Sequence, residues 1–181
     1  MDKNTHRIMV SSANEHWPSP QTILGPIKSR LGQIHLDPCS NPDSIVGAKH
    51  NFYGPPSEKF PNLPNNKDGL LETWQVGGIV YVNPPYGRKI GPWIKKCSTE
   101  GALAKELKQG TEIILLGPAR TDTKWFQRFV LPTADSVILW EGRLKFEGAK
   151  APAVFPSFIA YWGHRPIDFK IAFVGKGWAV T

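Results

Sequence analysis

The chain of 181 residues has only two cysteines, Cys39 and Cys97, and no long run of apolar residues. Two cysteines are too few for a disulfide framework, so we expect reduced thiols. A transmembrane helix is not expected without a run of about 18 apolar residues, and the N-terminus lacks the apolar stretch of a secretory signal. These absences predict a cytoplasmic protein. The length of 181 residues predicts a single domain over residues 1–181.

The histidines and cysteines also lack the spacing of a metal site. His6, His16, His50 and His164 form no ligand pattern with the two cysteines, so we predict no metal. His35 lies between apolar residues of a predicted strand and is expected to be a core histidine rather than an acid–base group.

Positive charge exceeds negative charge and is concentrated in one segment. The formal net charge is +7, and residues 88–150 hold 12 Lys/Arg against 7 Asp/Glu, which accounts for +5 of it. A basic surplus favours a polyanionic partner, most simply nucleic acid, although a solvated basic surface has the same composition.

Apolar patterning predicts an α/β fold. Strands are expected at residues 33–37, 78–83, 111–117, 135–140 and 157–162, and helices at residues 20–31, 90–108 and 123–131. Continuous apolar strands separated by helices indicate a mostly parallel sheet with helices on both faces, and the strand-rich C-terminal third favours antiparallel pairing there. The expected buried positions of the helix over 90–108 are Trp93, Ile94, Cys97, Leu103 and Leu107.

Two segments are expected to lack regular structure. Residues 1–14 are expected to be flexible, and the Pro- and Asn-rich residues 41–66 predict a long loop, which in a compact domain is often functional. In open sheets of this type, ligands bind at the carboxyl ends of the strands. Asp37, Asn83 and residues 118–120 fall at such ends, so we expect the functional site there.

The stretch IVYVNPPYG at residues 79–87 is an unusual way to end a buried strand. Pro84 and Pro85 stop the strand because proline has no N–H to donate to a sheet. The Asn83 side-chain oxygen and the Pro84 carbonyl oxygen can each accept one hydrogen from an amine on a flat heteroaromatic ring. Tyr86 can stack on that ring, and Gly87 allows close approach of the backbone.

Two acceptors on one amine make the lone pair of its nitrogen available for attack on an electrophile such as a methyl sulfonium. The rate then comes from positioning and oriented polar groups, without a metal or a strong base. A nucleic-acid base carries the matching amine, and it has to be flipped out of the duplex to reach such a site. The simpler interpretation is a Pro-Pro turn in which Asn83 caps locally and Tyr86 packs.

Several further blocks accompany this motif: LDPCS at 36–40, DGL with Trp74 at 68–74, PARTDTKWF at 118–126, GRLKF at 142–146 and PS at 156–157. On these blocks and NPPYG, the sequence resembles the phage-type DNA N-6-adenine methyltransferases, the Dam-like enzymes of phages and prophages, from about Glu15 to Trp162. The resemblance implies a Rossmann-like class I methyltransferase sandwich. It also implies methyl transfer from S-adenosylmethionine to the exocyclic amine of adenine in DNA, within a bacterial host cytoplasm.

The resemblance carries site residues with it. The implied catalytic motif is Asn83, Pro84, Pro85 and Tyr86. The implied cofactor contacts are Trp17, Ser19, Pro20, Asp37, Pro38, Cys39 and Asp68. Ser19 stands where the wider class has the threonine of a Thr-Pro element, and Asp68 is equally compatible with a turn in the stretch Asn-Lys-Asp-Gly.

Four basic residues are candidate DNA contacts: Arg120, Lys124, Arg143 and Lys145. Arg120 follows the strongest predicted strand and either holds a phosphate or pairs with Asp122, while Asp122 or Thr123 is expected to cap the next helix. In GRLKF, basic and apolar residues alternate, as in a strand with one basic face that contacts phosphate or is simply exposed.

Other functions stay open on the sequence alone. Pro38-Cys39 is the pair that cytosine carbon-5 methyltransferases use, in which Cys39 would attack the base. Asn-Pro-Pro-Tyr also fits methylation of the cytosine exocyclic amine or of a protein glutamine. A nucleic-acid-binding protein without chemistry fits the absence of a glycine-rich turn near Asp37.

Overall fold

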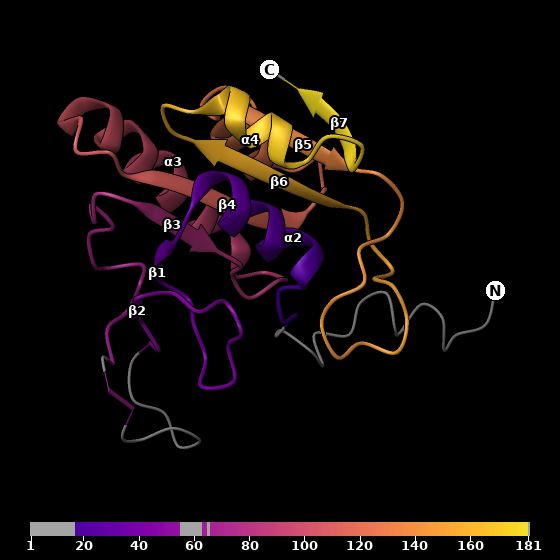
Figure 1. The fold of residues 1–181 in the computed structure, drawn as a ribbon, viewed down its shortest axis with the longest axis horizontal. Coiled ribbons are helices and arrows are strands. Elements are labelled where there is room, and N and C mark those ends of the chain that lie inside the picture. Colours follow the sequence, from indigo (N-terminus) through magenta and orange to yellow (C-terminus); the bar gives the residue numbers. More distant parts are fainter. Residues whose placement is uncertain (1–16, 55–62, 65, 181) are drawn as a thin grey trace.

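The computed structural model describes residues 17–54, 63–64 and 66–180, which form one mixed sheet with helices on both faces (Figure 1). The strands are β1 (Ile34–Asp37), β2 (His50–Asn51), β3 (Ile79–Val82), β4 (Glu112–Pro118), β5 (Ser136–Trp140), β6 (Ser157–Trp162) and β7 (Gly177–Val180). The helices are α2 (Gln21–Pro26), α3 (Ile90–Leu107) and α4 (Pro166–Ala172), with two π-helices, η1 (Ile27–Leu31) and η2 (Phe126–Val130). Residues 1–14, which we expected to be flexible, lie outside the described residues, and the single-domain organisation stays a prediction.

The sheet combines a parallel and an antiparallel part. Its seven strands lie in the order β2-β1-β3-β4-β6-β5-β7. Strands β2, β1, β3 and β4 are parallel to one another, whereas β6 is antiparallel to β4 and β5, and β7 is antiparallel to β5. The predicted α/β class is confirmed: four of the seven strands form the parallel part of the sheet, and the C-terminal part is antiparallel. Because β1, β3 and β4 are parallel neighbours, their carboxyl ends meet at one edge of the sheet.

Helices cover both faces of the sheet. Consecutive residues of a strand point to opposite faces, so neighbouring residues of β6 contact different helices. Tyr161 of β6 stacks on Phe169 of α4, with 4.8 Å between ring centroids. The next residue, Trp162, faces α3, where a Cβ at Gly101 would lie 2.6 Å from the Trp162 Cβ atom. Helices α4 and α3 therefore pack on opposite faces, and η1 lies beside α4, to which it is joined by a salt bridge. No helix among the described residues is long and apolar enough to span a membrane.

Three strands of the sheet are buried along their whole length. Every residue of β3, β4 and β6 is buried, as expected for strands covered on both faces. Continuous apolar sequence is therefore the signal that located them, and each predicted strand agrees with its observed counterpart to within one residue at either end.

The helix expected over residues 20–31 consists of two parts. Pro26 ends α2 and has no N–H for the helical ladder, and the following η1 closes with a bond from the Gly32 N–H to the Ile27 carbonyl oxygen. The helix over residues 20–31 was predicted from the helical spacing of Leu24, Ile27 and Leu31, and all three are buried.

Three expectations need correction or addition. Leu107 is 42% exposed because α3 ends there, and the chain leaves the helix at Lys108 with a φ of 52°. The strand expected at GRLKF is wrong, because residues 142–146 pair with no strand. Their backbone bonds are local: the Leu144 carbonyl oxygen accepts the Ala153 N–H, and the Phe146 carbonyl oxygen accepts the Ala149 N–H. The short elements β2, α4 and β7 were not predicted; β2 occupies two residues inside the expected loop over 41–66.

Candidate functional site

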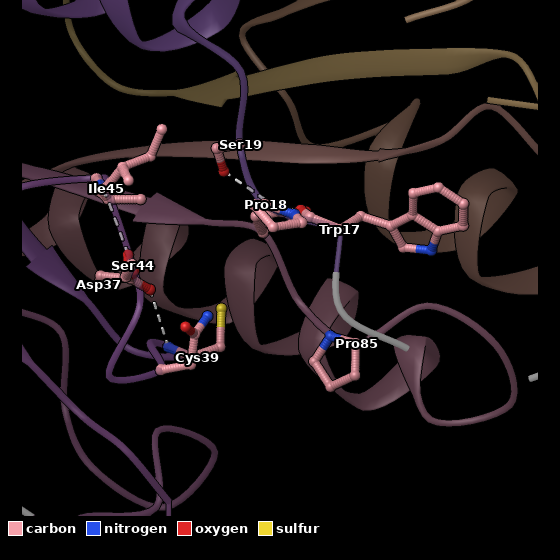
Figure 2. A pocket seen from close by; sticks show the side chains of 11 residues that line it. Trp17, Pro18, Ser19, Asp37, Cys39, Ser44, Ile45 and Pro85 are labelled. Carbon is pink, nitrogen blue, oxygen red and sulfur yellow. Dashed lines mark hydrogen bonds between the residues drawn. The ribbon is translucent and has the colours of Figure 1, made fainter. Parts of the chain in front are cut away.

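A pocket lies at the carboxyl ends of β1 and β3 (Figure 2). Three separate parts of the chain form its walls: residues 17–19 ahead of α2, the loop that follows β1, and the Asn-Pro-Pro-Tyr stretch after β3. The lining residues are Trp17, Pro18, Ser19, Asp37, Cys39, Asn41, Ser44, Ile45, Val46, Asn83 and Pro85. The sheet topology thus brings together residues that are far apart in the sequence.

Asp37 ends β1 with a carboxylate that is only 4% exposed. One carboxylate oxygen accepts the Cys39 backbone N–H at 3.2 Å, and the other accepts the Ser44 hydroxyl at 3.4 Å. Burial raises the pKa of this carboxyl from 3.8 to about 6, and the two hydrogen bonds only partly oppose that shift. At neutral pH the pocket therefore contains a poorly solvated negative charge, which is suited to a cationic ligand.

Asn83 follows β3 and is held by the segment ahead of α2. Its side-chain Nδ2 donates to the Trp17 carbonyl oxygen at 2.6 Å and to the Ser19 hydroxyl at 3.0 Å. Since a backbone carbonyl can only accept, the amide nitrogen must face Trp17, and Oδ1 must face the other way. That Oδ1 atom is buried and has no hydrogen-bond partner among the described residues. A buried amide oxygen without a donor is costly, and it is ready to accept a hydrogen from a ligand.

Ser19 is itself oriented by the strand beneath it. The Tyr81 hydroxyl, at the centre of β3, donates to the Ser19 hydroxyl at 2.9 Å. Both side chains are buried, and burial raises the pKa of Tyr81, so its hydroxyl stays protonated as a donor. Tyr81, Ser19 and Asn83 thus form one connected set of hydrogen bonds.

Tyr86 packs within a group of aromatic rings. The centroid of its ring lies 5.6 Å from that of Phe155 and 6.1 Å from that of Phe146, and both contacts are edge-to-face. The Trp17 ring centroid lies 5.1 Å from that of Phe146 and 5.3 Å from that of Phe155. The Tyr86 side chain is 7% exposed, and its hydroxyl has no partner among the described residues. An apolar, aromatic wall of this kind suits a flat ring ligand.

Cys39 lies in an environment that opposes nucleophilic chemistry. Burial and the neighbouring Asp37 carboxylate raise the pKa of its thiol well above 9.0. Because the thiolate is the reactive form, burial beside the Asp37 carboxylate argues against the covalent role considered for Cys39.

The structure brings most of the expected cofactor residues to one place. Of those named from the sequence, Trp17, Ser19, Asp37 and Cys39 line the pocket, together with Asn83 and Pro85 of the motif. Pro20, Pro38, Pro84 and Tyr86 are not among the residues that line it, although each is next in sequence to one that does.

Asp68 lies in a turn beside this pocket. Its carboxylate accepts the Leu70 N–H at 2.9 Å, which is the local turn bond that its sequence context allowed. The next residue, Gly69, lies directly against the loop after β1, since a Cβ there would be 1.9 Å from the Pro38 carbonyl oxygen. The turn therefore supports the loop that carries Asp37.

The four basic candidates are all exposed, at the edge where β4 ends and in the loop after β5. Arg120 forms no salt bridge with Asp122 within the described part of the chain. Thr123 caps the next helical segment by accepting the Phe126 N–H, as one of the two interpretations proposed. Arg143 and Lys145 alternate with the buried Leu144 and Phe146, although the segment is not a strand.

The sequence did not single out Tyr81 or Phe155 as site residues, nor Phe146 as a neighbour of Tyr86. Phe146 closes the GRLKF block and Phe155 directly precedes the PS block, so their position beside short distinctive blocks was the available signal. Tyr81 is one residue of an apolar strand, and nothing in the pattern distinguishes it from its neighbours.

Comparison with known proteins adds family information to this geometry. A family model described as DNA N-6-adenine-methyltransferase (Dam) matches residues 7–155. A search of curated proteins gave no match. Among the described residues, no group of three His, Cys, Asp or Glu side chains is arranged to hold a metal ion.

Proposed function

Because the chain belongs to the DNA N-6-adenine-methyltransferase (Dam) family, which indicates methylation of adenine in DNA, we propose that Asn83, Pro84, Pro85 and Tyr86 form its catalytic site. S-adenosylmethionine is the proposed methyl donor, and the target adenine is flipped out of the duplex to reach the site. The single observation that carries this proposal is the buried, unpartnered Oδ1 atom of Asn83 at the end of β3. The order and direction of the strands also support a Rossmann-like class I arrangement.

Two acceptors are available to the adenine amine. Asn83 Oδ1 is fixed in direction because both Nδ2 hydrogens are used by Trp17 and Ser19. Among the described residues, no donor bonds to the Pro84 carbonyl oxygen. One hydrogen bond to each oxygen draws the amine nitrogen away from conjugation with the ring, which increases the nucleophilicity of its lone pair. Neither acceptor has to reorganise when substrate binds, which is the main source of rate in such sites.

The pocket residues fit a cationic methyl donor. S-adenosylmethionine supplies an electrophilic methyl group on a positively charged sulfur, and its methionine part carries an ammonium group. The buried Asp37 carboxylate offers the opposite charge where little water competes. Trp17, Ser19 and Cys39 supply the remaining walls of this end of the pocket.

Tyr86 and the rings around it form the proposed base-binding wall. A flipped base loses its stacking in the duplex, and stacking on an aromatic side chain recovers about 1–3 kcal/mol. Phe146 and Phe155 hold the Tyr86 ring from its edges. Since Phe155 is only half-buried, a base can approach Tyr86 after a small displacement of this ring.

The proposed DNA contacts lie near this wall. Arg143 and Lys145 are exposed within three residues of Phe146. Arg120 is brought to the same region because the N–H of the preceding residue bonds to the Pro156 carbonyl oxygen at 2.8 Å, next to Phe155. Lys124 extends this basic surface. Phosphate contacts by these side chains would orient the duplex without reading its sequence.

The test is direct methylation. Purified protein is incubated with unmethylated DNA and S-adenosylmethionine, and the DNA is digested to nucleosides for mass spectrometry. N-6-methyldeoxyadenosine is the expected product. Methylated cytosine would retain the fold and cofactor but overturn the target base, and absence of any product together with absence of S-adenosylmethionine binding by calorimetry would favour a non-catalytic DNA-binding protein.

Matched variants assign the site. Asn83→Ala and Tyr86→Ala should each lower methyl transfer by at least about tenfold, because oriented polar contacts of this kind contribute about 10²–10³ in rate. Tyr86→Phe keeps the ring and removes only a hydroxyl that has no partner among the described residues, so it should retain most activity. Near-normal turnover of both alanine variants, in folded protein, would refute the assigned site.

A further inference from the structure

The segment that precedes α2 is bonded to the proposed catalytic asparagine rather than only lining the cofactor pocket. Ser19 accepts two hydrogen bonds, from Asn83 Nδ2 at 3.0 Å and from the Tyr81 hydroxyl at 2.9 Å. Ser19 is 4% exposed and Tyr81 is fully buried. The contact bridges two parts of the chain 64 residues apart, so it is a tertiary feature of the site.

The Asn83 amide can adopt two orientations that differ by exchange of its oxygen and nitrogen. The Trp17 carbonyl disfavours the orientation with Oδ1 toward it, because two acceptors would then face each other. Ser19 determines whether the second amide hydrogen is also satisfied. When both hydrogens of the amide nitrogen are bonded, electron density shifts toward Oδ1 and makes it a stronger acceptor.

We propose that Ser19 is a positioning residue for methyl transfer: together with Tyr81 it fixes the Asn83 amide so that Oδ1 faces the amine of the target adenine. This inference rests on the proposed function, and it assigns to Ser19 a role distinct from cofactor contact. Tyr81 acts through Ser19, since its hydroxyl supplies the hydrogen bond that holds the Ser19 oxygen in place. Neither residue touches the reacting atoms.

The two roles of Ser19 predict different kinetics. A cofactor contact would raise the KM for S-adenosylmethionine and weaken its binding, with kcat little changed. A positioning residue lowers kcat and leaves cofactor binding nearly unchanged. Ser19→Ala should therefore reduce kcat about tenfold, because small misplacements of a catalytic group cost one to two orders of magnitude, while the Kd for S-adenosylmethionine changes less than about twofold.

The decisive experiment is a double-mutant cycle between Ser19→Ala and Asn83→Ala, measured as single-turnover methylation with enzyme in excess. If Ser19 acts only through Asn83, the double variant should be no slower than Asn83→Ala alone. Ser19→Thr restores the hydroxyl and should recover most of the rate. Ser19→Ala alone leaves the buried Tyr81 hydroxyl without its partner, and the double variant Tyr81→Phe/Ser19→Ala removes that hydroxyl as well. A loss of rate that persists in the double variant is therefore not a consequence of misfolding around Tyr81.

Each outcome separates this inference from the proposed function. Additive losses in Ser19→Ala and Asn83→Ala, or a large loss of S-adenosylmethionine affinity with normal kcat, would overturn the positioning role and leave the catalytic site intact. Near-normal rates in Asn83→Ala itself would overturn the proposed site. The matched control is Ser29→Ala, which should behave as the unmodified protein. Ser29 is exposed, and its hydroxyl donates to the Pro26 carbonyl oxygen of its own helical segment.

Discussion

Replacing Asp37 with asparagine should make the ligand-free protein more stable at neutral pH while weakening its binding of S-adenosylmethionine. The carboxylate is 4% exposed and ends β1 in the proposed cofactor pocket. Asparagine has nearly the same shape, and its side-chain oxygen can still accept the Cys39 N–H. The Ser44 hydroxyl can turn from donor to acceptor toward the new amide nitrogen. The substitution therefore removes mainly the charge.

The magnitude follows from the pKa shift. Burial raises the pKa of Asp37 from 3.8 to about 6 in the folded protein, and a shift of about two units corresponds to about 3 kcal/mol. Between about pH 4 and pH 6, the Asp37 carboxyl is therefore protonated in the folded state and ionised in the unfolded state. Stability from this group is therefore present below pH 4, declines as the pH rises through 6, and is fully lost above it. Asp37→Asn should recover up to about 3 kcal/mol at pH 7.5, and progressively less at lower pH.

The assay is thermal unfolding of both proteins across pH 4.5–8, followed by calorimetry with S-adenosylmethionine. In a protein of this length, about 1 kcal/mol moves Tm by about 2–4 °C, so Asp37→Asn should melt several degrees higher at pH 7.5, with a smaller difference at pH 4.5. Cofactor affinity of the unmodified protein should fall below pH 6, as the carboxylate is neutralised. Asp37→Asn should bind weakly at every pH and lack this dependence.

Two results would contradict the reasoning. A lower Tm for Asp37→Asn at pH 7.5 would mean that the carboxylate is a net stabiliser of the turn after β1, so that no electrostatic cost is stored there. Unchanged cofactor affinity would mean that Asp37 does not contact the cationic ligand. The two measurements are independent, so either part can fail alone.

Three further predictions follow from other buried contacts. Glu100→Ala should lower the free energy of unfolding by about 3–5 kcal/mol, measured by urea denaturation, because it removes a buried carboxylate from the partly buried Lys96 ammonium and from two N–H donors. Gly69→Ala should weaken S-adenosylmethionine binding in calorimetry, since its Cβ would displace the Pro38 carbonyl, whereas Gly25→Ala, with open space at its Cβ in a helix, should be neutral or slightly stabilising. Arg143→Ala should weaken DNA binding for all sequences alike and reduce the slope of log affinity against log salt by about one; an unchanged slope would remove Arg143 from the interface.

Much of the fold could be predicted because its strands are continuous apolar runs. Strands β3, β4 and β6 are buried along their whole length, so their sequences do not depend on which neighbour they pair with. Apolar patterning alone does not identify a strand, as GRLKF shows. Leu144 and Phe146 are buried, whereas Arg143 and Lys145 are exposed. This is the alternation of a strand, but a strand also needs a neighbour to bond with. Whether a neighbouring strand is available depends on the whole fold and cannot be predicted from the five residues of GRLKF.

In the candidate site, too, some features could be predicted from the sequence and others depend on tertiary contacts. Asp37 and Asn83 were located from the sequence because each is the last residue of a predicted strand, and parallel strands bring their carboxyl ends to one edge. The orientation of the Asn83 side-chain amide is decided by Trp17 and Ser19, which are 66 and 64 residues away along the chain. A local motif thus specifies which groups are available for chemistry, whereas their orientation comes from tertiary contacts. For this reason a variant of Ser19 tests the structure more sharply than a variant of the motif itself. The motif alone leads us to expect a loss of rate in Asn83→Ala. A loss of rate in Ser19→Ala that disappears in the Asn83→Ala background is expected only from this arrangement of the chain.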